Sequence, residues 1–281
     1  MAQGNSTSGF FSKLASTIKS AAKIMLQSRP VRIRQVARPG EILVVMGNGP
    51  SLNTTMANHA DALKANRLMA VNFAANAPQF YNLRPDFYIM ADPVFFTDLT
   101  NANVKKLWDN FVGQIDWNMT LFIPSKSKLP VALPANITVN RFNPVGVEGF
   151  AWMENAAFSA GLGMPRPRNV LIPAIMIAIM SGFKKIYIVG ADHSWSKTLE
   201  VTEDNVVVSI QPHFYEDNEA EHSRVASVYK NIRLHQIMYS FYVAFRSYFT
   251  IASYASHRGV EIYNATPGSF IDAFVRKPLP D

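Results

Sequence analysis

The chain has 281 residues, of which 48% are hydrophobic and 17% are charged. This composition excludes an intrinsically disordered protein and supplies enough apolar residues for one large domain. The absence of cysteine excludes a disulfide scaffold, a cysteine nucleophile and a zinc–thiolate site.

The formal net charge of +7 belongs to the N-terminal segment. Residues 1–40 hold seven lysines and arginines and no acidic residue, which leaves 20 basic and 20 acidic residues in 41–281. A neutral body offers no extended basic surface, so we expect no nucleic-acid partner. We expect a basic leader over 1–40 and a body over 41–281.

Apolar residues recur at helical spacing between Phe10 and Arg29 and predict a basic amphipathic helix. One interpretation is contact of residues 10–38 with an anionic membrane surface. The other is a helix that docks on the body or on a partner, and a targeting segment is a third. No apolar run is long enough to span a bilayer, so we expect a cytoplasmic protein, peripheral on the inner face of the membrane in the first interpretation.

The body alternates short apolar strands with helices. Strands are predicted over residues 41–46, 68–73, 86–91, 120–123, 137–140, 186–189 and 260–263, and helices over 54–65, 94–111, 169–182, about 222–258 and 267–274. Strands separated by helices form right-handed crossovers and a parallel sheet. The predicted fold is therefore α/β and Rossmann-like, with a mostly parallel sheet and a lid-like loop at about 193–221.

Polar residues follow four of the predicted strands. The turn Gly47-Asn48-Gly49-Pro50-Ser51 follows the first, Asn72 the second, Asp92 the third, and Asp192-His193 the strand at 186–189. In an open parallel sheet, ligands bind at the carboxyl ends of the strands. The glycine turn can expose backbone N–H groups to a phosphate at a helix start, although a tight turn with no ligand remains the alternative.

The lid carries groups suited to proton transfer. His193, His213, Tyr215 and His222 lie in or beside it, and such a set offers donors and acceptors near neutral pH. Arg166 and Arg168 are further candidate contacts for a phosphate. The aromatic run from Tyr239 to Tyr254 is interpreted as a packing face of a helix.

The turn at 47–52, Asn72 and the stretch from Ile172 to Asp192 resemble the bacterial sialyltransferases of glycosyltransferase family 42 and the wider 6-hydroxymethylpterin diphosphokinase MptE-like group. The resemblance implies a sugar transferred from a nucleotide-activated donor to a surface glycan or lipid-linked acceptor, without a metal cofactor. It implies that Asn48, Gly49 and Ser51 hold the donor phosphate and sugar, that Asn72 contacts the donor, and that His222, or else His213, is the base.

The sequence also departs from the sialyltransferase pattern. Asp92 stands where that family has an asparagine, and His193 follows Asp192 where it has a tyrosine. Asp92 and Asp192 would hold magnesium in an alternative, MptE-like phosphotransferase. A nucleotide-sugar-binding protein of glycan assembly without catalysis is the other alternative.

Overall fold

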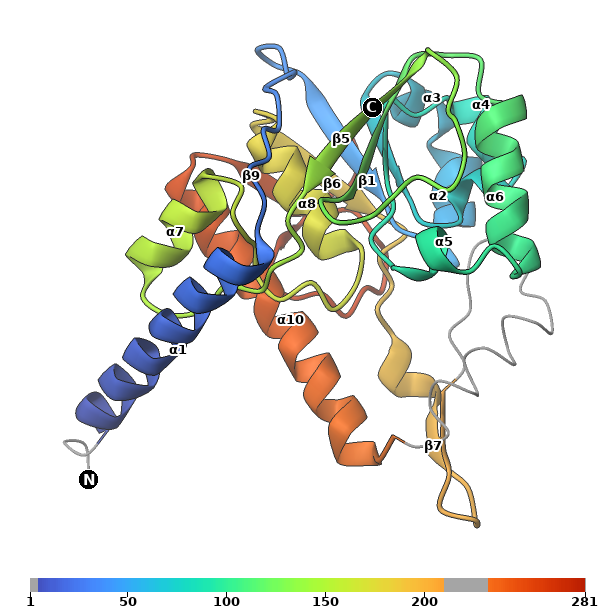
Figure 1. Cartoon of the computed structure of the whole chain (residues 1–281). Helices are drawn as coiled ribbons and strands as arrows, with labels where there is room; N and C mark the ends of the chain where they lie inside the picture. Colours follow the sequence, from blue (N-terminus) through green and yellow to red (C-terminus); the bar gives the residue numbers. More distant parts are fainter. Residues whose placement is uncertain (1–4, 210–231, 281) are drawn as a thin grey trace.

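The computed structural model describes residues 5–209 and 232–280, and its centre is an eight-stranded sheet (Figure 1). The strand order is β10-β9-β6-β1-β2-β3-β4-β5, and every neighbouring pair is parallel. In chain order these strands are β1 (Ile42–Met46), β2 (Arg67–Val71), β3 (Phe87–Ile89), β4 (Met119–Pro124), β5 (Ile137–Phe142), β6 (Lys185–Val189), β9 (Glu261–Asn264) and β10 (Val275–Arg276). The predicted Rossmann-like α/β fold with a mostly parallel sheet is confirmed.

Helices cover both faces of the sheet (Figure 1). On one face α7 (Ala151–Ser159), α8 (Leu171–Met180) and α10 (Leu234–His257) contribute to a core that includes Leu43 and Val45. On the other, α2 (Ser51–Asn58), α3 (Ala60–Lys64) and α6 (Ala102–Gly113) pack with Val44 and Met46. Successive side chains of a strand point to opposite faces, so the apolar run of β1 serves both cores.

The remaining elements are short or peripheral. They are α1 (Asn5–Gln27), α4 (Gln79–Leu83), α5 (Val94–Thr97), the 3-10 turns η1 (Ala74–Asn76) and η2 (Trp195–Thr198), and the antiparallel hairpin of β7 (Leu199–Val201) and β8 (Val207–Ser209). The hairpin gives the first part of the predicted lid more regular structure than the sequence indicated.

The chain reverses its direction across the sheet at β1. Strands β2 to β5 are added on one side of β1, and β6 then returns to its other side. Met46 pairs with Val189, so the carboxyl ends of β1 and β6 lie level. This switch point is where an open α/β sheet leaves a crevice for a ligand.

Two predicted helices are interrupted. The predicted helix 54–65 is divided into α2 and α3 at His59, and the helix over 94–111 is divided into α5 and α6. After the break between α5 and α6, Asn101 begins α6 as its N-cap. Its side-chain oxygen accepts hydrogen bonds from the N–H groups of Asn103 and Val104.

The predicted C-terminal helix at 267–274 is wrong. Gly268 has a φ of +67°, which a right-handed helix does not accommodate. The Ser269 hydroxyl donates to the Ala191 backbone oxygen at 2.6 Å, and the Phe270 N–H donates to that of Asp192 at 2.9 Å. The segment therefore packs on the end of β6 and continues into β10.

Candidate functional site at the ends of β1, β2 and β6

The glycine turn after β1 lies against the loop after β6. The N–H groups of Gly47 and Gly49 donate to the backbone oxygens of Val189 and Gly190, both at 2.8 Å. A Cβ on Gly49 would lie 2.0 Å from Oδ2 of Asp192, and one on Gly47 would lie 2.5 Å from the Gly190 oxygen. The glycines therefore permit a close approach of two loops, in addition to whatever ligand the turn binds.

Ser51 and Asp192 join the same two loops. The Ser51 hydroxyl donates to Oδ2 of Asp192 at 2.7 Å, and both residues are half-buried. Ser51 is the first residue of α2, and its N–H makes no hydrogen bond within the described residues; nor does that of Asn48. Pro50 lies between them and has no N–H. Two backbone donors thus remain available beside a carboxylate.

Asn48 and Asn72 supply acceptors on the β2 side. Nδ2 of Asn48 donates to the backbone oxygen of Val71 at 3.2 Å, which places Asn48 beside the end of β2. Asn72 follows β2 with a left-handed φ of +49°, and Tyr88 donates its hydroxyl proton to the Asn72 backbone oxygen. The side-chain oxygens of Asn48 and Asn72 are both buried and have no partner among the described residues. An unmet buried acceptor costs roughly 1–3 kcal/mol, which a ligand that donates hydrogen bonds would recover.

His193 lies inside the body. It is 9% exposed, its ring packs against that of Trp195 with centroids 4.2 Å apart and planes tilted by 34°, and Nε2 lies 2.6 Å from the hydroxyl of Tyr248 on α10. Burial lowers the pKa of His193 to about 3, so the ring is neutral near pH 7 and a poor proton acceptor. The role of His193 in catalysis stays a prediction, and this pKa disfavours a role as base.

Hydrogen bonds around Tyr248 define the tautomer of His193. Oδ1 of Asn169 accepts from the N–H of Leu171 at 3.0 Å, which orients the amide, and also contacts the Tyr248 hydroxyl at 2.9 Å. Tyr248 therefore donates to Asn169 and accepts from Nε2–H of His193, which leaves Nδ1 as the unprotonated nitrogen. This network could not be predicted from the sequence, because Asn169, His193 and Tyr248 are widely separated along the chain.

Asp92 lies apart from the turn. It is exposed, and Oδ1 accepts from the N–H of Val94 at 3.0 Å at the start of α5. Three strand spacings separate β3 from β6, about 14 Å in all, so Asp92 and Asp192 are poorly placed to share one magnesium ion. No group of three or more His, Asp or Glu side chains suited to a metal occurs within residues 5–209 and 232–280.

His213, Tyr215 and His222 lie outside the described residues. Their assignment as base and donor contacts stays a prediction.

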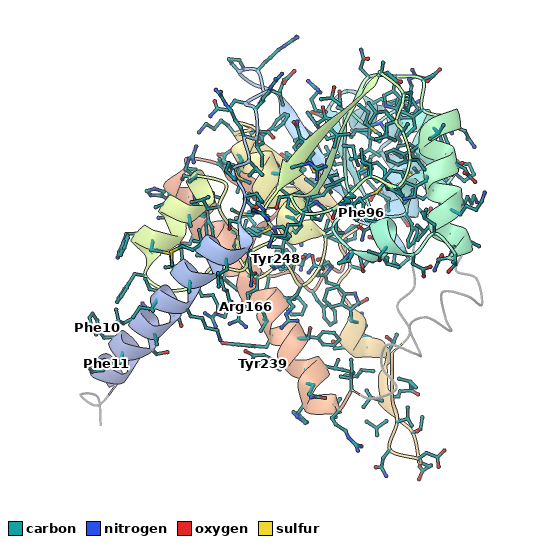
Figure 2. The ribbon with its side chains drawn as sticks, in the orientation of Figure 1. Phe10, Phe11, Phe96, Arg166, Tyr239 and Tyr248 are labelled. Atoms are coloured by element: carbon teal, nitrogen blue, oxygen red, sulfur yellow. The ribbon has the colours of Figure 1, made fainter. Side chains whose placement is uncertain are left out.

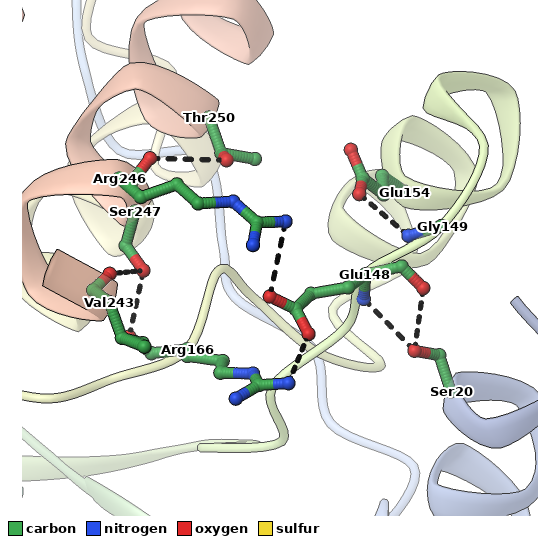
Figure 3. Close-up of polar contacts among 9 residues, drawn as sticks. All are labelled: Ser20, Glu148, Gly149, Glu154, Arg166, Val243, Arg246, Ser247 and Thr250. Atoms are coloured by element: carbon green, nitrogen blue, oxygen red, sulfur yellow. Dashed lines mark hydrogen bonds and ion pairs between the residues drawn. The ribbon is translucent and has the colours of Figure 1, made fainter. Parts of the chain in front are cut away.

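Of the two candidate arginines, Arg166 has an internal partner. Its guanidinium forms an ion pair with Glu148, whose other oxygen lies 3.4 Å from Arg246 of α10 (Figure 3). Arg168 is exposed. In this conformation the charge of Arg166 is already paired with Glu148, which also contacts α10 through Arg246. Arg166 therefore has a structural contact here, and its contact with a phosphate stays a prediction.

No family model and no curated protein matches the chain. The MAf glycosyltransferase from Magnetospirillum magneticum AMB-1 is similar in structure, with a TM-score of 0.50 and 9% sequence identity over 95% of this chain. The match covers 38% of that larger chain. At this identity the likeness shows a shared fold.

Proposed function

We propose that this protein is a glycosyltransferase that binds a nucleotide-activated sugar at the carboxyl ends of β1, β2 and β6. The observation that carries the proposal is the pair of buried side-chain oxygens on Asn48 and Asn72, which have no partner among the described residues. They lie toward β2, whereas Asp192 follows β6 on the other side of β1. These three acceptors adjoin the free N–H groups of Asn48 and Ser51.

The mixture of groups matches a ligand with two kinds of surface. Sugar and ribose hydroxyls donate hydrogen bonds, so they suit the amide oxygens and the carboxylate. A phosphate accepts them, so it suits the N–H groups at the start of α2. Because Asp192 repels a phosphate, the favoured arrangement has the phosphate at the turn and a hydroxyl group at Asp192. A nucleotide sugar has both surfaces.

The fold shared with a protein named as a glycosyltransferase supports the same class of reaction. In the proposed step an acceptor hydroxyl oxygen bonds to the anomeric carbon of the donor sugar. The bond from that carbon to the phosphate oxygen breaks, and the nucleotide leaves with the electron pair. The acceptor proton passes to a histidine, for which His222 is our first candidate and His213 our second. A surface glycan or a lipid-linked glycan is the proposed acceptor.

A thermal-shift screen tests the proposal. CMP-, UDP- and GDP-sugars and ATP are each added with and without magnesium, and nucleotide release is measured for every ligand that binds. A ligand at 100 times its Kd stabilises the folded protein by about 2.7 kcal/mol, which raises the Tm by roughly 5–10 °C.

We expect a nucleotide sugar to raise the Tm without magnesium and to release its nucleotide. A shift produced by ATP with magnesium alone would contradict the proposal and favour a phosphotransferase. Binding of a nucleotide sugar with no turnover, in the presence of glycan acceptors, would instead favour an assembly protein without catalysis.

A further inference from the structure

The helix α1 docks on the body through polar side chains. Ser20 is 2% exposed, and its hydroxyl donates to the backbone oxygen of Glu148 at 2.8 Å and accepts from the N–H of the same residue at 2.9 Å (Figure 3). Oγ1 of Thr17 accepts from the N–H of Phe150 at 3.0 Å. A Cβ on Gly149 would lie 2.1 Å from that Oγ1, so the glycine permits this approach.

The apolar side of α1 faces solvent instead. Its members are Phe11 (66% exposed), Leu14 (38%), Ile18 (63%) and Met25 (78%), which we call the α1 stripe. At 100° per residue, the mean directions of the α1 stripe and of the docked residues Thr17, Ser20 and Ile24 differ by roughly 120°. A helix that served only to complete this fold would bury its apolar side, so the α1 stripe is available to a partner.

The apolar surface extends from α1 onto the body. Phe10, which is 53% exposed, lies with its ring 5.5 Å from that of Phe150 near the outer end of the helix (Figure 2). Trp152, two residues further on, is 69% exposed. Phenylalanine and tryptophan in such positions suit the boundary between lipid headgroups and acyl chains.

The segment that carries the α1 stripe has charges of one sign. At 100° per residue, Lys19 and Lys23 lie roughly 110° and 150° from the middle of the α1 stripe. The segment that follows carries the exposed residues Arg29, Arg32, Arg34 and Arg38. Within the described part of the chain these six side chains form no ion pair, and residues 1–40 contain no acid. A second copy of the chain would bring the same charges together, whereas an anionic partner would neutralise them.

The segment between α1 and β1, which carries the arginines at 29–38, is hydrogen-bonded to the body. Asn143, 1% exposed, donates to the backbone oxygen of Arg29 and accepts from its N–H, and the N–H groups of Val36 and Ala37 donate to the Ser181 oxygen. No helix within residues 5–209 and 232–280 is long and apolar enough to cross a membrane. A bound surface would therefore be contacted from one side.

We propose that the α1 stripe, Lys19, Lys23 and the arginines at 29–38 hold this protein on the surface of an anionic lipid bilayer, with α1 lying in the plane of the interface. Lysines and arginines contact the headgroups while the apolar side chains enter about 5–10 Å deep. This inference does not rest on the proposed transferase activity, since it concerns side chains that take no part in the candidate site at the strand ends.

Flotation of the full chain with vesicles tests the proposal. Vesicles of phosphatidylcholine with 30% phosphatidylglycerol are compared with pure phosphatidylcholine, at low and high salt. Ile18→Asp places a charge in the α1 stripe, and Val112→Asp is the matched control, because Val112 on α6 is 48% exposed and distant from α1 (Figure 1). Lys19→Gln/Lys23→Gln removes charge and keeps the apolar residues.

We expect binding to the anionic vesicles that is weakened by salt, reduced at least tenfold by Ile18→Asp and unchanged by Val112→Asp. The lysine pair should contribute about fivefold per residue, which corresponds to the value of about 1 kcal/mol for each cation near such a surface. Absence of wild-type binding to anionic vesicles would overturn the proposal, as would equal binding by the lysine variant. A dimer that Ile18→Asp dissociates, without vesicle binding by the wild type, would overturn it in favour of self-association.

Discussion

Replacing Gly49 by alanine should separate the two loops of the candidate site. The new Cβ would lie 2.0 Å from Oδ2 of Asp192 and 2.8 Å from the Gly190 oxygen. One of these contacts is with backbone, so a side-chain rotation alone cannot relieve the crowding. The turn must move away from β6, which weakens the Ser51–Asp192 hydrogen bond and the bond from the Gly49 N–H to Gly190.

The expected loss of stability follows from these contacts. A hydrogen bond to a charged group contributes roughly 1.5–3 kcal/mol and a neutral one about 1 kcal/mol, and overpacking costs roughly 1–3 kcal/mol. Because the loops relax and keep part of these interactions, we expect the free energy of unfolding to fall by roughly 3 kcal/mol in total, which lowers the Tm by about 6–12 °C.

Urea unfolding of wild type and four variants checks this prediction: Gly49→Ala, Gly113→Ala, Asp192→Ala and the Gly49→Ala/Asp192→Ala double variant. Gly113→Ala is the matched control, since nothing lies within 4 Å of its new Cβ, and it should be neutral or slightly stabilising in α6. Gly49→Ala should cost at least about 1 kcal/mol less in an Asp192→Ala background, because the nearest clash is then removed. If Gly49→Ala stayed within about 0.5 kcal/mol of wild type, the close approach of the loops would be refuted.

Three further predictions concern the rest of the molecule. Burial lowers the pKa of His193 to about 3, so the unfolded chain binds a proton below about pH 6.5 that the folded chain does not, and stability falls as the pH drops from 6.5 toward 3. Between pH 6.5 and 5, wild type should lose roughly 1.5–2 kcal/mol more than His193→Gln in urea unfolding; equal losses would contradict the burial. Glu148→Ala should lower the free energy of unfolding by about 2 kcal/mol, because it removes the ion-pair partner of Arg166. Arg246→Ala should lower it by less than about 1 kcal/mol, because the Arg246 side chain is exposed. The reverse order in urea unfolding would contradict the structure. Gly149→Ala should release α1 to limited proteolysis while the body stays resistant, and unchanged cleavage would show that the approach of Thr17 is not needed.

The sheet could be predicted from the sequence because its strands are short, continuous apolar runs. A strand buried on both faces needs apolar residues along its buried part. β1 is apolar throughout, and β2 and β6 carry apolar or aromatic residues at every position after the first, which is basic. The right-handed crossover rule then makes the sheet parallel. The same rule brings the turn at 47–51, Asn72 and Asp192 to one edge, so these three sites could be placed together.

Features that depend on long-range contacts could not be predicted. Near the end of the chain, Ser269 and Phe270 donate hydrogen bonds to Ala191 and Asp192, which follow β6 and are 78 residues earlier in the sequence. Local propensity carries no information about these contacts. The environment of His193 depends in the same way on Tyr248 of α10. The predicted amphipathic helix at the N-terminus is present, but its docking through Ser20 depends on the loop at 148–150.

The packing role of the aromatic run on α10 could be predicted only in part. Tyr248 and Tyr254 are buried, as a packing face requires, and they contact the core beside α8. Tyr239, Tyr242 and Phe249 are more than half exposed. The packing interpretation thus holds for part of the run. Tyr239 lies on the end of α10 that extends beyond the body (Figure 2), whereas Phe249 follows the buried Tyr248 and lies on another side of the helix.

The affinity of Asn72→Gly for a nucleotide sugar is the most direct test of the proposed donor site. Glycine adopts the φ of +49° without strain, so this change removes the unpartnered amide and keeps the backbone. Isothermal titration with the nucleotide sugar that gives the largest thermal shift should show binding about tenfold weaker than wild type, as expected for one lost hydrogen bond of about 1.4 kcal/mol. A Kd equal to that of wild type would place the donor elsewhere and contradict the account.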